Sequence, residues 1–136
     1  MYLLDTNVVS ELRRPRPHGA VMAWMSSVPA HELTISAVTV GEIQAGIEIA
    51  RLQNAAKASE LERWLDKIVG AFDVLAMDAA IFRQWARLMH QRAGELSLDA
   101  MIAATAITHN LTVATRNESD FEHFGVRIFN PFVGPH

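Results

Sequence analysis

The sequence contains five short runs rich in apolar residues, and each is too short to form a helix of ordinary length. They cover residues 1–4, 33–36, 74–77, 111–115 and 126–129. Apolar runs of about four to eight residues are typical of buried strands. Between them, apolar residues recur at helical spacing over residues 8–12, 19–28, 37–54, 55–71, 79–92 and 98–109. Strands that alternate with helices predict βαβ units, so we expect an α/β fold with a short, mainly parallel sheet and helices on both faces.

The last two helical segments carry capping signals. Asp78 and Ser97 stand at their starts as predicted N-caps, and Gly94 follows the first of the two as its terminator. The polar stretch 116–120, between the last two strands, carries no helical period. We expect a turn there.

Length and composition limit the possible classes of protein. A chain of 136 residues has the size of one domain, and no repeat or linker divides it, so residues 1–136 are predicted to form a single domain. Hydrophobic residues make up 50% and charged residues 20%, which is enough apolar mass for a core. The formal net charge of -3 provides no basic field for nucleic acid. Any contact with nucleic acid is therefore expected to be local or made through a metal.

The absence of some residue types excludes further classes. The chain has no cysteine, which rules out disulfides, thiolate metal sites and a cysteine nucleophile. No apolar run approaches the roughly 20 residues of a membrane span. The first residues carry no basic segment of the kind that opens a secretory signal. We therefore expect a cytoplasmic protein without membrane contact.

Four acids are predicted to meet at one edge of the sheet. Asp5 follows the first strand, Glu42 lies in the helix after the second, Asp99 begins the helix before the fourth, and Asp120 follows the fourth. In open parallel sheets, functional sites collect beyond the carboxyl ends of the strands. No lysine lies in these segments to neutralise the acids. The pattern therefore predicts an acidic cleft at that edge.

Glu42 is predicted to face the core, because its helical neighbours at i-4, i+3 and i+7 are Val38, Ala45 and Ile49. A buried carboxylate is costly unless it is paired or binds metal. The alternative is a glutamate at the rim of the core that reaches solvent. Glu48 falls on the polar arc of the same helix and is expected at the surface.

Each of the other acids also has an ordinary structural interpretation. Asp5 and Asp120 are placed where helix caps or loop acids are common. Asp99 stands in the first turn of an almost wholly apolar helix, where the helix dipole favours an acid. Small residues on its side of the helix, Ala103 and Ala106, would let another backbone approach closely. The functional interpretation depends on all of these acids converging.

Clustered carboxylates repel one another, so they bind protons or a cation. All-oxygen ligands without cysteine or a close histidine pair favour Mg²⁺ or Mn²⁺, which act mainly on phosphate oxygens. The sequence Asp5-Thr6-Asn7 lacks the second acid that haloacid-dehalogenase phosphatases and receiver domains need there, and no Gly-x-Ser-x-Gly elbow is present. The chemistry predicted is metal-assisted phosphodiester hydrolysis.

Several motifs occur in the order found in PIN domains. They are the segments 1–7, 40–43, 99–106 and 112–121, with the closing segment 126–132. The chain resembles the PIN-domain family over essentially its whole length, and within it the VapC-type toxins of bacterial type II toxin–antitoxin pairs. The resemblance implies a PIN-like three-layer α/β/α fold and a Mg²⁺-dependent ribonuclease, with Mn²⁺ as a possible substitute. The expected products carry a 5′-phosphate and a 3′-hydroxyl.

The resemblance also assigns residues. The family's acidic quartet maps onto Asp5, Glu42, Asp99 and a fourth acid in the segment 115–121. Asp5 and Asp99 are expected to hold the metal directly. Glu42 is expected to hold it or to orient a bound water.

Supporting residues and the fourth acid follow from the same motifs. Thr6 and Asn7 match the polar pair after the first aspartate, and Thr115 matches the strand-end hydroxyl beside the site. Many family members have an aspartate two residues after this threonine, where this chain has Asn117. Asp120 is the remaining candidate, expected to act through water or on a second ion.

The partners implied by the family are a cognate antitoxin, an RNA substrate, promoter DNA bound through the antitoxin, and a second copy of the chain. The segments 19–28 and 37–54 are candidate contact surfaces for antitoxin and homodimer. Two alternatives remain open. One is a binding module that acts only through an antitoxin–DNA complex, and the other is an RNA-processing or DNA-directed nuclease on the same domain.

Overall fold

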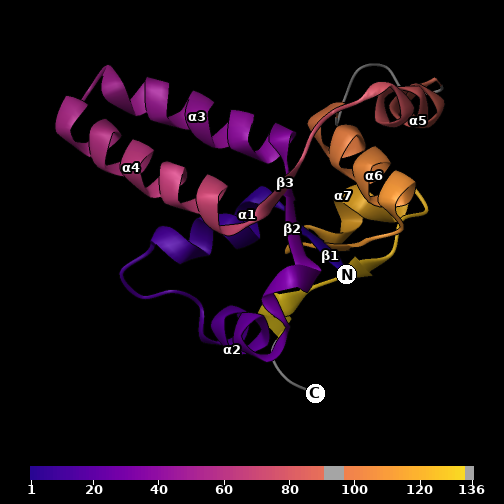
Figure 1. Ribbon diagram of the computed structural model, residues 1–136, viewed down its shortest axis with the longest axis horizontal. Helices are drawn as coiled ribbons and strands as arrows, with labels where there is room; N and C mark the ends of the chain where they lie inside the picture. The colour runs from indigo at the N-terminus through magenta and orange to yellow at the C-terminus, as the bar shows by residue number, and fades with distance from the viewer. Residues whose placement is uncertain (91–96, 134–136) are drawn as a thin grey trace.

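The computed structural model describes residues 1–90 and 97–133. Within these residues, five strands form one sheet in the order β3-β2-β1-β4-β5, and every neighbouring pair is parallel (Figure 1). The strands are β1 (Tyr2–Leu4), β2 (Leu33–Ser36), β3 (Asp73–Leu75), β4 (Thr112–Ala114) and β5 (Ile128–Phe129). The prediction of a short, mainly parallel sheet is confirmed.

Helices connect the strands. They are α1 (Thr6–Val9), α2 (Gly19–Ser27), α3 (Ala37–Arg51), α4 (Ala55–Ala71), α5 (Ala79–Met89), α6 (Ser97–His109) and α7 (Glu118–Glu122), with 3-10 turns η1 (Ser10–Arg13), η2 (Ala30–Glu32) and η3 (Pro131–Val133). Asp78 caps α5 as predicted, because its carboxylate accepts the Ile81 N–H at 2.9 Å. Gly94, the predicted terminator of that helix, lies outside the described residues. Among the helices described, none is long and apolar enough to cross a membrane.

The two faces of the sheet carry separate cores because successive strand residues point to opposite sides. Leu3 is fully buried in a cluster with α6 and with Phe121 of α7, against which α5 packs. Leu4, its neighbour, is fully buried in a second cluster with Val8, Val21 and Ile68 of α1, α2 and α4. This arrangement is the expected three-layer α/β/α architecture. Figure 1 shows the α3–α4 pair and the α5–α6 pair extending from the sheet as two arms.

Three local predictions are wrong at their boundaries. The third strand covers Asp73–Leu75 rather than 74–77, because its partner β2 ends at Ser36, which is paired with Leu75. The segment 8–12 is divided between α1 and a 3-10 turn. The polar stretch 116–120 is not simply a turn, since helix α7 begins within it. Fully buried Phe121 anchors this short helix on the sheet.

The strand order places the functional edge. β1 lies in the middle of the sheet, with β2 on one side and β4 on the other. The chain therefore winds away from β1 in one direction to β2 and β3, and returns on the other side at β4. A crevice forms at such a switch point, beyond the carboxyl ends of the strands. Asp5 and Thr115 directly follow β1 and β4 at this edge.

Candidate active site

Asp5 is the most enclosed of the four acids, with only 5% of its surface exposed. Its Oδ1 accepts the Thr6 N–H at 2.8 Å, and its Oδ2 accepts the Thr115 hydroxyl at 2.8 Å and the Asn7 amide at 3.2 Å. Burial raises the pKa of Asp5, these three hydrogen bonds oppose that rise, and the charge of Asp120 adds to it. Asp5 also caps α1. The capping interpretation of Asp5 is therefore confirmed, and the same side chain faces the predicted site.

Thr115, at the end of β4, connects the two central strands through its hydroxyl. The residue is fully buried, and its Oγ1 accepts the backbone N–H of Asn117 at 3.0 Å while donating to Asp5. Asn7 is held by the same loop, because its Oδ1 accepts the backbone N–H of Arg116 at 3.1 Å. The predicted supporting residues therefore fix the orientation of the Asp5 carboxylate.

Glu42 lies near Asp5 but at the rim of the core. Its side chain is half-buried, and Ile49, predicted to flank it on a buried face, is 66% exposed. The prediction of a buried face was therefore wrong, because the described part of the chain leaves Ala45 and Ile49 exposed on that side of α3. Burial is still the main cause of the raised pKa of Glu42, the Thr6 hydrogen bond lowers it, and the charge of Asp5 raises it. The Thr6 hydroxyl donates to Glu42 Oε1 at 3.1 Å.

Asp99 receives charge repulsion from all three other acids. Burial raises its pKa to about 6, and the charges of Asp5, Asp120 and Glu42 contribute in that order. Close packing of α6 brings it there: Ala103 and Ala106 are fully buried in the same cluster as Leu3 of β1. Small side chains between a helix and a strand allow their backbones to approach, so Asp99 reaches the edge where Asp5 lies.

Asp120 completes the group from α7, which lies on the same face of the sheet as α6. It lies in the first turn of α7 and is half-buried, and its charge raises the pKa of both Asp5 and Asp99. Asn117, the residue that stands where many family members have an acid, is exposed and precedes α7. The structure therefore brings Asp5, Glu42 and Asp120 into electrostatic range of Asp99, as the strand order predicts.

The donor set fits a hard divalent cation held by few protein ligands. Asp5 Oδ1 accepts a single hydrogen bond and keeps a lone pair. Asp99 accepts no hydrogen bond from any residue that the structure describes. Across residues 1–90 and 97–133, no three acidic or histidine side chains are gathered closely enough for a ready three-ligand site. Mg²⁺ is usually bound by one or two carboxylates together with water and substrate phosphate, so this arrangement suits it.

Two contributors were missed by the sequence interpretation. Thr39, fully buried one turn before Glu42, lies 3.4 Å from the Thr6 hydroxyl and helps to hold it. A threonine three positions before Glu42, on the same side of the helix, was the signal that could have identified it. Arg116 was also missed. Its guanidinium stacks 3.9 Å from the centre of the Phe132 ring, a contact between residues too far apart in sequence to predict.

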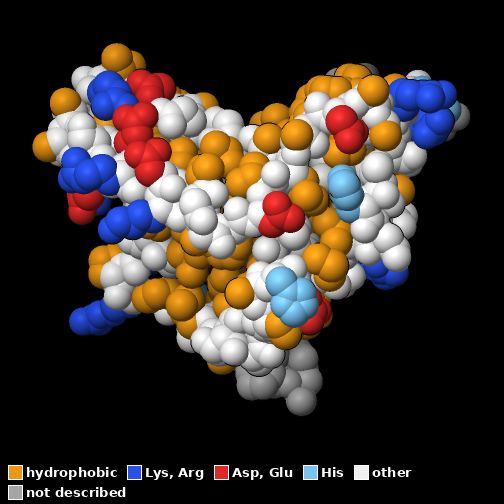
Figure 2. Space-filling model, in the orientation of Figure 1, with side chains coloured by type: hydrophobic (Ala, Val, Ile, Leu, Met, Phe, Trp, Pro, Cys, Tyr) orange, Lys and Arg blue, Asp and Glu red, His pale blue; other side chains and the backbone are white. Residues whose placement is uncertain are grey.

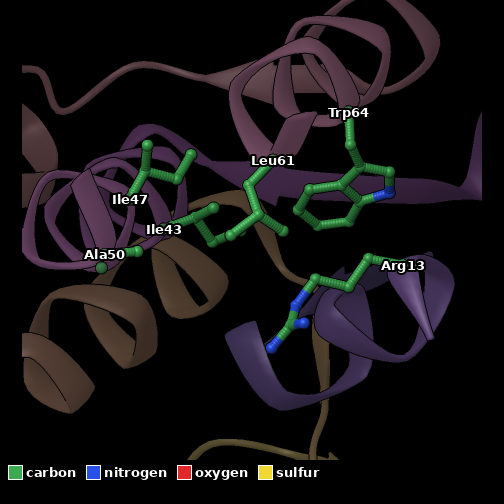
Figure 3. Close-up of a pocket in the computed structure, with 7 residues that line it drawn as sticks. Arg13, Ile43, Ile47, Ala50, Leu61 and Trp64 are labelled. Atoms are coloured by element: carbon green, nitrogen blue, oxygen red, sulfur yellow. The ribbon is translucent and has the colours of Figure 1, made fainter. Parts of the chain in front are cut away.

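An apolar hollow of about 300 Å³ lies between α3, α4 and Arg13 of η1. It is lined by Arg13, Ile43, Gly46, Ile47, Ala50, Leu61 and Trp64 (Figure 3). Hydrophobic side chains gather on the same arm of the molecule in Figure 2, and charged ones gather nearer its end. Arg51, at the end of α3, bonds to Glu48 at 3.0 Å and to Glu62 at 2.5 Å. Glu48 is exposed, as predicted.

Comparison with known proteins identifies the family. The model of the PIN domain matches residues 2–126. Toxin FitB of Neisseria gonorrhoeae is 39% identical over 97% of this chain and 99% of its own length. The chain therefore belongs to the PIN-domain family.

Two further relatives support the resemblance to VapC-type toxins. VapC ribonuclease Y4jK of Sinorhizobium fredii is 38% identical over 97% of this chain and 98% of its own. The solved structure of FitAB bound to an IR36 DNA fragment contains a chain with a TM-score of 0.85 and 35% identity, covering 100% of this chain and 99% of that one. The predicted family and fold are confirmed.

Proposed function

We propose that this chain is a metal-dependent endoribonuclease, the toxin of a type II toxin–antitoxin pair, which hydrolyses RNA phosphodiester bonds with water. The observation that carries the proposal is the group of four carboxylates at the switch point of the sheet, three of which have raised pKa values. Acids that repel one another favour binding of a cation, because the cation offsets their mutual repulsion. Relatives named as ribonucleases and as a toxin agree with this function.

The residues divide the chemical work among them. Asp5 and Asp99 would hold Mg²⁺ directly, with Mn²⁺ able to replace it. The bound cation would lower the pKa of a water and offset negative charge on the phosphate. Glu42, oriented by Thr6, would hold the cation or position the attacking water. Thr115 and Asn7 keep the Asp5 carboxylate turned toward the site. Cleavage would leave a 5′-phosphate and a 3′-hydroxyl.

Cleavage of RNA by the purified chain tests the proposal directly. Single-stranded RNA should be cut in Mg²⁺ or Mn²⁺ and remain intact in excess chelator, and single-stranded DNA of the same sequence should resist. Cutting of the DNA would favour the DNA-directed nuclease. If both nucleic acids stay intact while the chain still forms a DNA-binding complex with an antitoxin, the protein is a binding module.

The role of Asp120 can be separated from that of the direct ligands. If Asp120 acts through water, Asp120→Asn should weaken Mg²⁺ affinity about 10- to 100-fold while cleavage persists at saturating metal. Titration of the cleavage rate with Mg²⁺ measures this shift. Loss of cleavage at every Mg²⁺ concentration would make Asp120 a direct ligand. An unchanged titration curve would leave Asp120 only a structural role at the start of α7.

The partners proposed are an antitoxin, which carries the pair onto promoter DNA, and a second copy of this chain. The chain seen in the FitAB structure bound to DNA is similar over the whole length of this one. The hollow beside α3 is a candidate antitoxin contact, and Leu52, just beyond the end of α3, is 88% exposed. The exposed side chains of α2 and α3 are the candidate surface for the second copy.

A substitution at Gly46 tests the hollow. A Cβ at this helical glycine would meet no atom within 4 Å, so the first carbon of a larger side chain can be added beside the hollow without a clash. Gly46→Phe should weaken antitoxin association by at least about tenfold, which corresponds to losing one well-buried contact residue, and RNA cleavage should persist. Gly46→Ala, which leaves the hollow largely open, is the control. Equal affinity of both variants for the antitoxin, measured by calorimetry, would remove the hollow from the interface.

A further inference from the structure

The backbone of Arg116 lies beside the acidic site. Arg116 directly follows Thr115, whose hydroxyl donates to Asp5, and its own N–H donates to the Asn7 side chain at 3.1 Å. The position is therefore fixed by the same hydrogen bonds that orient the Asp5 carboxylate. The sequence-derived assignment of the site, which named acids and their hydrogen-bond donors, gives this cation no role.

The side chain of Arg116 is held by an aromatic ring from the other end of the chain. Its guanidinium carbon lies 3.9 Å from the centre of the Phe132 ring. Phe132 makes two further contacts. The centre of its ring lies 5.1 Å from the centre of the His18 ring, and its backbone N–H donates to Asn130 Oδ1 at 2.9 Å. Asn130 in turn donates to Glu118, two residues after Arg116, at 3.0 Å. The ring that supports the guanidinium is therefore itself anchored.

Stacking leaves the hydrogen-bonding edge of the guanidinium available. The ring covers one flat face, whereas the five N–H donors of arginine point outward in the guanidinium plane. Arg116 is exposed, and no carboxylate among the residues described lies within 4.0 Å of its nitrogen atoms. Glu118, the nearest acid in sequence, is bonded to Asn130. Arg116 is thus an oriented cation without an ion-pair partner in the described part of the chain.

The charge of the site shows what this cation would bind. Four carboxylates at the sheet edge and a net charge of -3 repel a polyanion, and one divalent cation offsets only part of that repulsion. A planar guanidinium matches the geometry of a phosphate group, and a side chain already held in place loses less conformational freedom on binding. We propose that Arg116, stacked on Phe132, binds a phosphate of the RNA strand beside the one that is cleaved. The proposal rests on the ribonuclease function above.

Binding of a fluorescent single-stranded RNA, in chelator so that no cleavage occurs, tests the proposal. Arg116→Gln should weaken binding about tenfold, and it should reduce the slope of log affinity against log salt concentration by about 0.7, the value for one phosphate contact on a single strand. Arg116→Lys should keep the slope, with an intermediate affinity. Phe132→Leu, which keeps the charge, should keep the slope and lose about threefold in affinity, the order of an exposed cation–π contact. Arg63→Gln on α4, an exposed arginine with the same change of charge, should match the wild type.

Steady-state cleavage in Mg²⁺ separates binding from positioning. For Arg116→Gln, KM should rise about tenfold with little change in kcat, since a flanking phosphate is bound equally in substrate and transition state. Equal affinity, salt slope and KM for Arg116→Gln and Arg63→Gln would overturn the proposal. A fall in kcat alone would also overturn it, by making Arg116 a support for the loop. RNA binding that depends on Arg116 without any cleavage by the wild type would refute the ribonuclease function and keep only the contact between Arg116 and a phosphate of bound RNA.

Discussion

An Asp5→Asn variant is expected to lose RNA cleavage in Mg²⁺ by more than the roughly 10- to 100-fold that follows loss of an outer-shell partner of a metal. The amide keeps the shape of the carboxylate and its single oxygen can still accept the Thr6 N–H, while its NH2 group takes the place of the oxygen to which the Thr115 hydroxyl donates. The substitution removes the charge nearest the switch point. The measurement is the initial rate of RNA cleavage at several Mg²⁺ concentrations. Far-ultraviolet circular dichroism should show the fold unchanged.

The control for this variant is Asp66→Asn. Asp66 lies exposed on α4, and its substitution removes the same charge at a position outside the acidic group. Its cleavage rate should equal that of the wild type. An Asp5→Asn protein that is folded and cleaves at the wild-type rate would show that Asp5 serves only as the cap of α1.

Asp99→Asn is expected to abolish cleavage and, in chelator at pH 7, to make the protein more stable. Two carboxylates about 5 Å apart repel by roughly 3 kcal/mol at an effective dielectric constant near 20. Asp99 is half-buried, so solvent screening reduces the stability gained on neutralising it to about 1 kcal/mol. In a domain of this size that gain raises Tm by about 3–6 °C. Sites that hold like charges together for chemistry are expected to show this trade of stability for function.

The pH dependence of stability has a defined sign. The pKa of Asp99 is about 6 in the folded protein, above its ordinary value of 3.8, so the folded state binds the proton more tightly than the unfolded state does. Protonation of Asp99 therefore stabilises the fold fully below pH 4, and this contribution is lost as the pH rises through 6. The raised pKa values of Asp5 and Glu42 act in the same direction. The free energy of unfolding in chelator should fall between pH 4 and pH 6, and less steeply in Asp99→Asn.

Thermal melts of both proteins, with chelator and with Mn²⁺, decide between this account and the helix-dipole role of Asp99. Added Mn²⁺ should stabilise the wild type by mass action on the folded state, and stabilise the variant less. If Asp99 serves only the dipole of α6, its neutralisation should instead cost about 0.3–1 kcal/mol, and metal should affect neither protein. A destabilised variant beside a wild type that ignores metal would refute the acidic-site interpretation.

The hydrophobic pattern and the capping residues correctly predicted the helices and strands whose ends are determined by their own residues. Strand β2 and helix α4 begin and end at the predicted residues, because α4 is amphipathic and Asn54 caps its start. Strand β3 is displaced because the end of a strand depends on its partner, and β2 stops at Ser36. Helix α7 was missed because the burial of Phe121 stabilises it, and that burial is a tertiary effect.

The same division applies to the site. The acids were predictable because parallel strands bring their carboxyl ends to one edge, so that position in the strand order alone places Asp5 beside Thr115. Glu42 was predicted to face the core because a helical wheel assumes that an apolar face is covered. In the structure Ile49, on that face, remains exposed. The Arg116–Phe132 contact joins distant parts of the chain and has no local signal.

The packing of α6 on the sheet has a consequence for genetic selection. Ala103 and Ala106 act as spacers, since both are fully buried against the cluster around Leu3 and set how near Asp99 comes to the strand ends. A valine at either place would push the helix outward, and a displacement of about 1 Å at a reacting centre can cost a hundredfold in rate. Cells selected for survival while they produce this chain should therefore carry substitutions at Ala103 and Ala106 as well as at the acids. If the chain is the proposed toxin, an inactive variant can differ from the active one by two methyl groups that touch neither metal nor RNA.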